Sequence, residues 1–531
     1  MTRTRRRIDP APAESTSVAR DLAIALVVAV LTFLAFTPAL GAEFVNYDDE
    51  SLIVAHAQHL DSFAHALPWA FGTTEMGHWQ PLTWLSWAVD FAGSGVRPEA
   101  FHRTNLLLHA ATAAVLFGAV RRLFALVFTQ ARPLALSVAA ALAALGWSLH
   151  PLRVESVAWA TERRDVLSGL FLVTALYAHL RAVTPGTREL ARGWNRAAIV
   201  CLVLSLLSKA WGMTFGVLLV ALDVFPLRRL SADPRRWVER EQRAVWLQKL
   251  PHFVCGAAAA GMAFHAQASS PDTVRGLAEW GVLERVTQAC HGLAFYVAKT
   301  IWPTNLVAVR ELPYHLDPTE PRFLASFAFV ALAATVIVLA RRRAPALALA
   351  AVVYVVTLAP VLGFVQSGPQ LVADRYSYLS CMPWSILLCG AVLSAGLSLQ
   401  WLRGLAGLAL VVLGIAFGAT RVQTHVWRDT RSLWEHAFAC DVPSSIACLD
   451  YGVWLADAGR RDEALAMFER AVAIRPDQGR AWFALGNTLK AAGRFAEAEP
   501  AYQAATRTMV PAYQPWSNLG NREDGQPLGE F

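Results

Sequence analysis

Three consecutive carboxylates, Asp48, Asp49 and Glu50, follow the first long apolar run of the chain. A carboxylate beside a reacting hydroxyl can accept its proton, so this cluster is a candidate for acid–base chemistry. The alternative is that the three side chains are the solvated surface of a loop. Their function therefore depends on which other charges the fold brings to them.

Four basic residues in short polar segments are candidates for binding an anion: Arg163, Arg164, Lys209 and Arg375. The positive-inside rule depletes the outer side of a membrane protein of Lys and Arg. If these segments face outward, as the topology below predicts, their cations need an anionic partner, and a lipid phosphate at the interface would suit them. The alternative is that Arg163 or Arg375 pairs with a nearby Asp or Glu.

The fold that must position these residues is that of a membrane protein, as the composition indicates. Of the 531 residues, 55% are hydrophobic and 16% are charged, whereas soluble domains carry about 25% charged residues. The formal net charge of +7 does not indicate nucleic-acid binding, because the basic residues stand in short clusters between apolar runs. The seven cysteines form no zinc or redox motif. Cys440 and Cys448 either form a disulfide or pack as small side chains.

Apolar segments of spanning length recur about eleven times. They lie at about 22–41, 104–123, 133–149, 166–182, 197–209, 211–226, 251–268, 322–340, 346–363, 378–398 and 403–420. If these spans alternate, the basic clusters fall on one side, which is the cytoplasm. The moderately apolar segment 282–302 carries charges, and we interpret it as an interfacial or re-entrant helix because 341–343 then stays inside.

With that alternation, residues 42–103, 150–165, the region of Lys209, residues 366–378 and everything after about 421 face outward. No Asn-x-Ser/Thr sequence occurs, and the composition is rich in Ala and Arg. We therefore expect a bacterial inner membrane protein whose C-terminal part is periplasmic.

The last part of the chain has the period of a tetratricopeptide (TPR) repeat. Gly452, Gly486 and Gly520 are 34 residues apart, and Phe468 with Tyr502 has the same spacing. Two full repeats are predicted, with partial ones around Trp434 and from Trp516. Such an array either presents a concave surface to an extended peptide or serves as a packing cap.

Eight short motifs, in order, resemble those of the transmembrane and TPR-repeat-containing (TMTC-like) O-mannosyltransferases and their bacterial relatives in the GT-C class. They are VNYDD (45–49), HWQPLTWL (78–85), FHRTNLLLH (101–109), HPLRVESVAW (150–159), ERRDVLS (162–168), SK (208–209), KTIWPTNL (299–306) and ADRYSYL (373–379). Two positions depart from the family pattern: Ala210 follows Lys209 where proline is common, and Gln80 stands where histidine is frequent.

The resemblance implies an all-α, polytopic glycosyltransferase that uses a polyprenyl-phosphate sugar donor, with a hydroxyl acceptor, protein Ser/Thr or another glycan, and a sugar such as mannose. It implies a basic cytoplasmic N-terminus (1–21), a transmembrane domain (22–421) and a TPR domain (422–531). The acidic pair of the first outward loop would then lie at the active site, with Asp48 as the base and Asp49 orienting the acceptor or substituting for Asp48. Lys209, Arg164, Arg375 and Arg163 would stabilise the departing phosphate.

Three further side chains are candidates for lining the cleft: His78, His150 and Glu155. Histidines at helix ends are also common as structural residues. No metal site is assigned, and a requirement for a divalent metal stays open. The competing interpretations are a non-catalytic membrane anchor that displays a TPR scaffold and a transporter, which would place its charges mid-span. Asp223 is the clearest acidic residue inside a predicted span.

Overall fold

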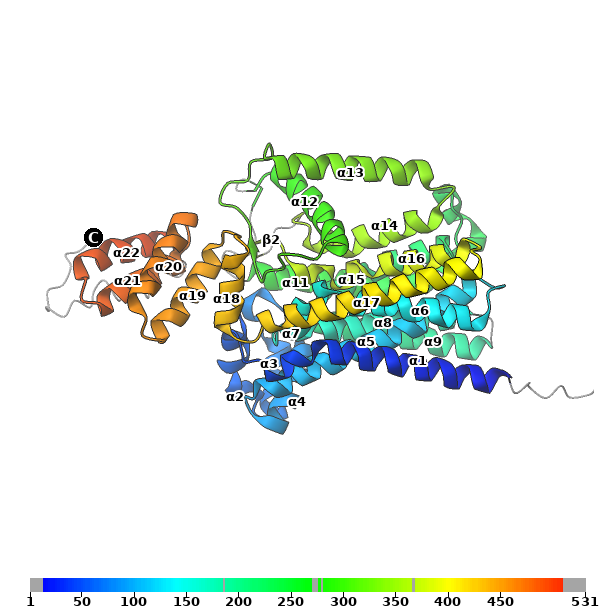
Figure 1. The fold of residues 1–531 in the computed structure, drawn as a ribbon, viewed down its shortest axis with the longest axis horizontal. Helices are drawn as coiled ribbons and strands as arrows, with labels where there is room; N and C mark the ends of the chain where they lie inside the picture. The colour runs from blue at the N-terminus through cyan, green and yellow to red at the C-terminus, as the bar shows by residue number, and fades with distance from the viewer. Residues whose placement is uncertain (1–12, 185–186, 270–275, 278–279, 365–367, 510–531) are drawn as a thin grey trace, which may run out of the picture.

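The computed structural model describes residues 13–184, 187–269, 276–277, 280–364 and 368–509. A bundle of long helices forms the body of the protein, and a smaller helical domain projects from one end of it (Figure 1). The helices of the first half are α1 (Ala13–Phe36), α2 (Ala57–Leu60), α3 (Phe63–Gly72), α4 (Pro81–Ser94), α5 (Pro98–Val127), α6 (Pro133–Ser148), α7 (Val154–Ala158), α8 (Arg163–Ala182), α9 (Arg188–Ser208) and α10 (Phe215–Val224). Those that complete the bundle are α11 (Arg243–Ala268), α12 (Val282–Ile301), α13 (Pro321–Ala340), α14 (Pro345–Leu358), α15 (Ser377–Ser380), α16 (Met382–Ser394) and α17 (Leu399–Val426).

The expected all-α fold is confirmed. Within the described residues the strands are β1 (Arg310–Glu311) and β2 (Gln370–Val372), which pair antiparallel. The projecting domain contains α18 (Thr430–Ala439), α19 (Ser445–Asp457), α20 (Arg461–Ile474), α21 (Gly479–Ala491) and α22 (Phe495–Thr508). Because α17 continues to Val426, the last bundle helix passes the boundary expected at residue 421.

Each of the eleven expected segments folds as a helix, but fewer than eleven are full spans. Among the described residues, five helices are long and apolar enough to cross a membrane, and the number rises to seven if two bent pairs each count as one span. By this test of length and composition, several of the eleven expected segments are too short, and the segment 378–398 is broken. The chain bends by 59° between α6 and α7 and by 45° before α16, while α10 and α14 belong to shorter apolar stretches. The segment 282–302 forms α12, which is not among the five.

Both bends carry residues that the sequence marked as functional. His150 lies in the first bend and Glu155 in the helix directly after it, and Arg375 lies in the segment 374–380 that leads into the second. Non-helical backbone at membrane depth is tolerated where it is buried in protein or lines a polar cavity. The bends therefore indicate where the bundle contains a polar site.

The ends of the bundle differ in what they carry. α1 and α17 both begin at the end opposite the projecting domain, and the connection between α13 and α14 lies there too (Figure 1). The clusters at 341–343 and at Arg403 thus share one end, as the alternation of spans predicted. The basic residues before position 13 lie outside the described residues.

Close packing fixes the centre of the bundle, where α8 lies against α5 and α9. A Cβ atom on Gly169 of α8 would come within 2.6 Å of the Tyr378 ring. The Tyr378 hydroxyl lies 2.9 Å from His109 Nδ1, and the Trp147 indole donates to the Tyr378 carbonyl oxygen at 2.7 Å. These contacts hold the segment that carries Arg375 against α5, α6 and α8.

The repeat architecture predicted from the 34-residue period is confirmed for two helix pairs, α19–α20 and α21–α22. A Cβ on Gly452 would clash with the Phe468 ring at 2.5 Å, and one on Gly486 would meet Tyr502 at 2.8 Å. Glycine is required at both positions because each helix pair approaches so closely. The partial repeat from Trp516 lies outside the described residues.

Cys440 and Cys448 are free thiols, so the disulfide interpretation is wrong and the packing interpretation holds. Cys448 is buried in the core of the repeats, and the Cys440 sulfur lies 3.5 Å from His436 Nε2.

Glu311 and Asn46 both connect the repeats to the bundle. The Glu311 carboxylate accepts hydrogen bonds from the Ser445 backbone N–H at 2.7 Å and from Arg475 Nη1 at 3.1 Å, so it caps the start of α19. Asn46, in the loop after α1, donates its side-chain amide to the Asp450 carbonyl oxygen at 2.6 Å and accepts from the Trp434 indole at 3.0 Å. The repeats are therefore held directly beside the loop that carries Asp48 and Asp49.

Candidate functional site

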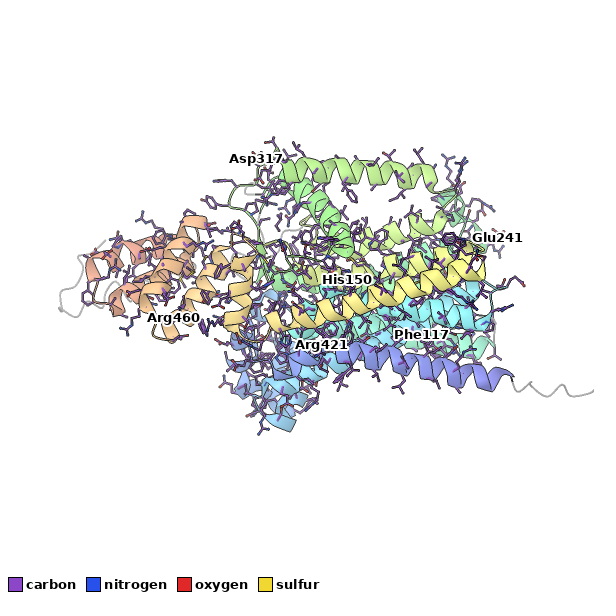
Figure 2. The ribbon with its side chains drawn as sticks, in the orientation of Figure 1. Phe117, His150, Glu241, Asp317, Arg421 and Arg460 are labelled. Atoms are coloured by element: carbon purple, nitrogen blue, oxygen red, sulfur yellow. The ribbon has the colours of Figure 1, made fainter. Side chains whose placement is uncertain are left out.

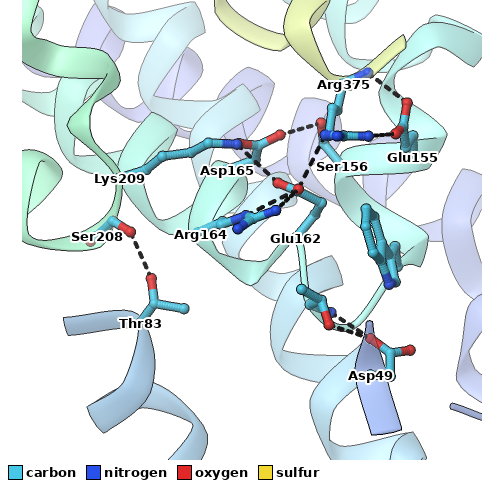
Figure 3. Close-up of polar contacts among 12 residues, drawn as sticks. Asp49, Thr83, Glu155, Ser156, Glu162, Arg164, Asp165, Ser208, Lys209 and Arg375 are labelled. Carbon is cyan, nitrogen blue, oxygen red and sulfur yellow. Dashed lines mark hydrogen bonds and ion pairs between the residues drawn. The ribbon is translucent and has the colours of Figure 1, made fainter. Parts of the chain in front are cut away.

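The centre of the candidate site is Glu162, in the turn between α7 and α8 (Figure 3). Three of the four predicted phosphate-binding cations converge on its fully buried carboxylate. Arg164 Nη2 lies 2.5 Å and Arg375 Nε 3.3 Å from Glu162 Oε1, and Lys209 Nζ lies 3.1 Å from Oε2. Although burial raises the pKa of Glu162, the charges of Arg164, Lys209 and Arg375 hold it well below its usual range.

Three separate elements deliver these cations. Arg164 lies in the first turn of α8, and Arg375 lies in the short 3₁₀ turn before α15. Lys209 follows the last residue of α9 in an extended conformation, which ends that helix and turns the side chain back toward α8. Each cation thus stands at a helix end, where a change of backbone direction points it inward.

Two further carboxylates neutralise the cluster. Glu155 accepts hydrogen bonds from the Arg375 backbone N–H at 2.8 Å and from its guanidinium group. Asp165 accepts from Lys209 Nζ at 2.5 Å and from the Ser156 hydroxyl at 2.8 Å. With Glu162, three carboxylates therefore face three cations, and the predicted cleft residue Glu155 holds Arg375 in place.

Asp48 and Asp49 differ sharply in their contacts. Asp49 is buried, and its oxygens accept from the Thr161 N–H at 2.9 Å, the Thr161 hydroxyl at 2.6 Å and the Val45 N–H at 3.1 Å. Its neighbour Asp48 is half-buried, and no described residue donates a hydrogen bond to its carboxylate. Asp49 therefore ties the loop to the turn that carries Glu162, while Asp48 remains free to contact a ligand.

Burial governs the protonation of both acids. It raises the pKa of Asp48 to about 6, against the charges of Arg164 and Arg375, which lower it. It raises the pKa of Asp49 to about 7, against the hydrogen bonds from Thr161 and Val45. A carboxyl with a pKa near 6 is ionised at neutral pH yet more basic than an ordinary aspartate, as a general base requires.

His78 also lies near the cluster. The ring is half-buried, and burial together with the charges of Arg164 and Lys209 lowers its pKa well below the usual value. No described residue hydrogen-bonds to it. The imidazole is therefore neutral at pH 7, and its contact with a ligand in the cleft stays a prediction.

Two predicted site residues lie elsewhere. Arg163 is fully buried, where Nη2 contacts Asp90 Oδ2 at 2.6 Å and the Phe101 carbonyl oxygen at 2.8 Å, and Nε contacts Asn105. The side chain of His150, whose place in the bundle is labelled in Figure 2, accepts from the Leu152 N–H at 3.3 Å and lies 3.0 Å from the Thr300 carbonyl oxygen of α12. The structure therefore does not bring either side chain to the Glu162 cluster, and both have structural partners.

Glu162 and Asp165 are the residues that sequence reasoning missed. Both lie in the motif ERRDVLS, where they flank the two arginines, and the sequence alone suggests that they are local ion-pair partners of those arginines. A signal was present, because carboxylates on both sides of an outward Arg-Arg pair can hold cations from distant segments as well as local ones.

Aromatic rings close the side of the site that faces the repeats. Tyr47 stacks on Trp159 with ring centroids 4.7 Å apart, and Trp159 stacks on Trp427 at 5.5 Å. The Arg375 guanidinium lies over Trp159, 5.5 Å from the ring centroid. Beyond this wall, a pocket of about 10 Å³ is lined by Pro151, Val154, Glu155, Leu306, Val307, Asp374, Gln423 and Trp427. That volume accommodates about one water molecule, so this pocket cannot hold a sugar.

The described residues contain no group of three or more His, Cys, Asp or Glu side chains arranged to hold a metal ion. The intramembrane candidate Asp223 is fully buried and pairs with Arg229 at 3.0 Å and Lys249 at 2.8 Å. These two ion pairs neutralise the Asp223 carboxylate, so its role is structural.

Comparison with known proteins agrees with the resemblance given by the motifs. The family described as tetratricopeptide repeat matches residues 455–514. The chain is 28% identical to the human "Protein O-mannosyl-transferase TMTC2" over 217 residues, which is 39% of this chain and 24% of that protein. It is 26% identical to human TMTC4 (39% of this chain, 30% of that protein) and 24% identical to Drosophila melanogaster Tmtc3 (82% and 52%). The chain thus spans about a quarter of the length of the first of these relatives.

One solved structure is similar over most of the chain. It is the crystal structure of ArnT from Cupriavidus metallidurans bound to undecaprenyl phosphate, with 16% identity, a TM-score of 0.35, and coverage of 92% of this chain and 79% of that one.

Proposed function

We propose that this protein is a membrane glycosyltransferase that moves a sugar from a polyprenyl-phosphate donor to a hydroxyl group. One observation carries the proposal: an unpartnered carboxylate, Asp48, lies in the electrostatic field of Arg164 and Arg375, which share Glu162 with Lys209. A base and a group of cations at one site are what glycosyl transfer from a phosphate requires. The similar O-mannosyltransferases support the same class of reaction.

The cations act on the leaving group. As the bond between the anomeric carbon and the phosphate oxygen breaks, negative charge grows on the polyprenyl phosphate. Fixed guanidinium and ammonium groups in a buried site stabilise that charge better than water does. Lys209 is the most accessible of the three, with 15% of its side chain exposed.

Because three carboxylates already neutralise the three cations, the donor phosphate must compete with Glu162 for them. Lys209 can turn toward the phosphate while Asp165 and Glu162 keep Arg164 and the turn in place. Glu162 therefore gathers the cations before the donor arrives and yields part of its contacts when the phosphate binds.

Asp48 acts on the acceptor. Its carboxylate takes the proton from the attacking hydroxyl, the hydroxyl oxygen forms the new bond to the anomeric carbon, and the polyprenyl phosphate leaves with the electron pair of the broken bond. Asp49 positions the loop through its three hydrogen bonds and does not need to contact substrate. Neutral His78 is placed to hydrogen-bond to the sugar or the phosphate.

The acceptor in this proposal is Ser or Thr of a protein, and the sugar is mannose. The relatives' names support both, and the repeats lie beside the loop that carries Asp48. In a bacterial inner membrane the site and the repeats would face the periplasm, and Arg342 would face the cytoplasm.

A transfer assay in membranes that contain the full chain tests the proposal. Radiolabelled mannose is supplied either on a polyprenyl phosphate or on a nucleotide, with and without a chelator. Labelled protein should form from the lipid-linked donor alone. Label that moves from the nucleotide sugar in membranes lacking polyprenyl phosphate would contradict the proposed donor. Membranes with Asp48→Asn are the matched control.

Deletion of residues 444–531 tests the role of the repeats. Thr430 and Trp434 would still hold Asn46, so the loop keeps two of its anchors. We expect loss of transfer to protein with slow hydrolysis of the donor retained. Parental transfer by the truncated chain would show that the repeats do not present the acceptor.

A further inference from the structure

The side of α19 that faces the catalytic loop carries a buried carboxylate that the mechanism above does not use. Asp450 is buried, with 8% of its surface exposed. Its backbone carbonyl oxygen accepts the hydrogen bond from the Asn46 side-chain amide. No described residue donates a hydrogen bond to its carboxylate. The carboxylate has lost most of its water but its oxygens still reach solvent, so a cation or an N–H donor of a ligand can contact and stabilise it.

Other acidic groups surround this carboxylate. The charges of Asp48 and Glu50 both act on Asp450, and the charge of Asp457 acts on Glu50. Asp450 and Asp457 are separated by two helical turns and therefore share one face of α19. Four carboxylates thus lie along the boundary between the catalytic loop and the first repeat. We call this set, Asp48, Glu50, Asp450 and Asp457, the acidic rim.

Among the described residues of the repeats, one cation lowers the pKa of carboxylates in the acidic rim. The charge of Arg480, in α21, lowers the pKa of both Asp48 and Asp450. Burial nevertheless raises the pKa of Asp450 to about 8, because one arginine does not compensate for two acidic neighbours and the loss of water. A second positive charge at this place would stabilise the ionised carboxylate.

The acidic rim is also continuous with the proposed reaction centre. Asp48 belongs to both, and Asn46, two residues before it, binds the backbone of Asp450. A polypeptide whose hydroxyl reaches Asp48 must therefore pass close to Asp450. The charges of the residues that flank this hydroxyl then interact with the carboxylates of the acidic rim.

We propose that the acidic rim selects polypeptide acceptors that carry Lys or Arg beside the acceptor Ser or Thr, and that Asp450 is the specificity-determining residue. This inference rests on the proposed function for the identity of the ligand as an acceptor. The binding preference itself can be measured without sugar transfer.

The test uses the purified full-length chain in lipid nanodiscs and three peptides with one central threonine flanked by lysine, glutamine or glutamate. Fluorescence anisotropy at pH 9, above the pKa of Asp450 and below that of lysine, gives the Kd of each peptide. The lysine peptide should bind at least about tenfold more tightly than the glutamate peptide, the size expected for one charge-assisted contact. The preference should weaken as salt is raised, since exposed charges are screened.

At pH 9, where the Asp450 carboxyl with its pKa of about 8 is mostly ionised, Asp450→Asn removes the charge with little change of shape, and it should reduce the ratio of the two Kd values about tenfold. Glu463→Gln is the matched control, because Glu463 lies on α20 and pairs with Arg460 at 2.6 Å on an exposed surface. It should leave the ratio as in the parent. Equal affinity of the three peptides for the parent, or an unchanged ratio in Asp450→Asn, would overturn the inference.

Transfer assays with the same peptides separate the two proposals. If the lysine peptide binds selectively through Asp450 but no sugar moves from a polyprenyl-phosphate donor to any acceptor, the binding site stands and the proposed function fails. If a lipid or glycan acceptor is glycosylated while the peptides bind without preference, the proposed function stands and this inference fails.

Discussion

Arg163 and Arg164 are neighbours in the chain, yet they belong to two networks with different properties. Arg163 points between α4 and α5, where Asp90, Asn105 and a backbone carbonyl oxygen satisfy its guanidinium group. Arg164 points the other way, to Glu162, which it shares with Lys209 and Arg375. The first network is a closed ion pair, since Thr104 also donates to Asp90 at 2.7 Å.

The second network differs because it adjoins groups without partners. Asp48 and His78 lie within the field of its cations, and neither receives a hydrogen bond from a described residue. Burial and ion pairing are common to both networks, so they do not identify a functional site. Titratable groups that the fold leaves unpartnered beside the ion pairs do identify one.

The largest effect that this comparison predicts is on catalysis. Asp48→Asn removes the base while leaving both networks intact, and it should lower the rate of transfer by about 10²- to 10⁴-fold. The melting temperature should stay close to that of the parent, because no hydrogen bond to Asp48 is lost. Rates come from initial-velocity assays with a polyprenyl-phosphate donor. Full activity of this variant would mean that Asp48 is a surface residue.

Loss of Arg163 should affect stability instead. Arg163→Met leaves the Asp90 carboxylate without its cation, and breaking a buried pair costs about 3 to 5 kcal/mol. Thermal unfolding of the purified protein measures the loss, and the rate per folded molecule should remain parental. A variant that unfolds normally but transfers no sugar would place Arg163 in the site after all.

Smaller changes are expected in donor use. Lys209→Ala and Arg375→Ala should each weaken the affinity for the donor by about 1.5 to 3 kcal/mol, since each removes a charge-assisted contact. Lys209→Ala also leaves Asp165 unpaired, so the double variant Lys209→Ala/Asp165→Asn is the matched control for stability. Donor affinity that recovers in the double variant would show that Lys209 acts only through Asp165.

The smallest effect is on the pH profile. Because the pKa of Asp48 is about 6, kcat/KM should rise with pH as this carboxyl loses its proton and level off above about 6. His78 is neutral over this range, so His78→Gln should not move the midpoint. A parental midpoint near 4, or one that shifts in His78→Gln, would assign the titration to another group.

The fold was largely predictable because its signals are local. Spanning-length apolar runs predicted the bundle helices, and the spacing of Gly452 and Gly486 predicted two helix pairs that pack closely. The end of the helix before His150 was predicted, because the apolar run stops at 149 and Pro151 follows. The break before Met382 was not predicted, since it lies inside the apolar run 378–398, although Pro383 stands there.

The site was predictable in part. The positive-inside rule singled out Lys209, Arg164 and Arg375, and the structure brings these three together at Glu162, while their binding of a phosphate stays a prediction. The positive-inside rule could not separate Arg163 from Arg164, because it depends on position along the chain. Adjacent residues on a helix point in different directions, and that direction decides which network each arginine joins. Asp450 was missed because its relation to Asp48 depends on how the repeats dock against the bundle.

Binding of a polyprenyl phosphate that carries no sugar tests the central claim most directly. The purified parent, Arg163→Met and Arg164→Met would be titrated in detergent micelles, with the Kd referred to the folded fraction. The parent and Arg163→Met should share one Kd, and Arg164→Met should bind at least about tenfold more weakly. If Arg164→Met binds as tightly as the parent, or if both variants lose the same affinity, the Glu162 cluster is not the phosphate site.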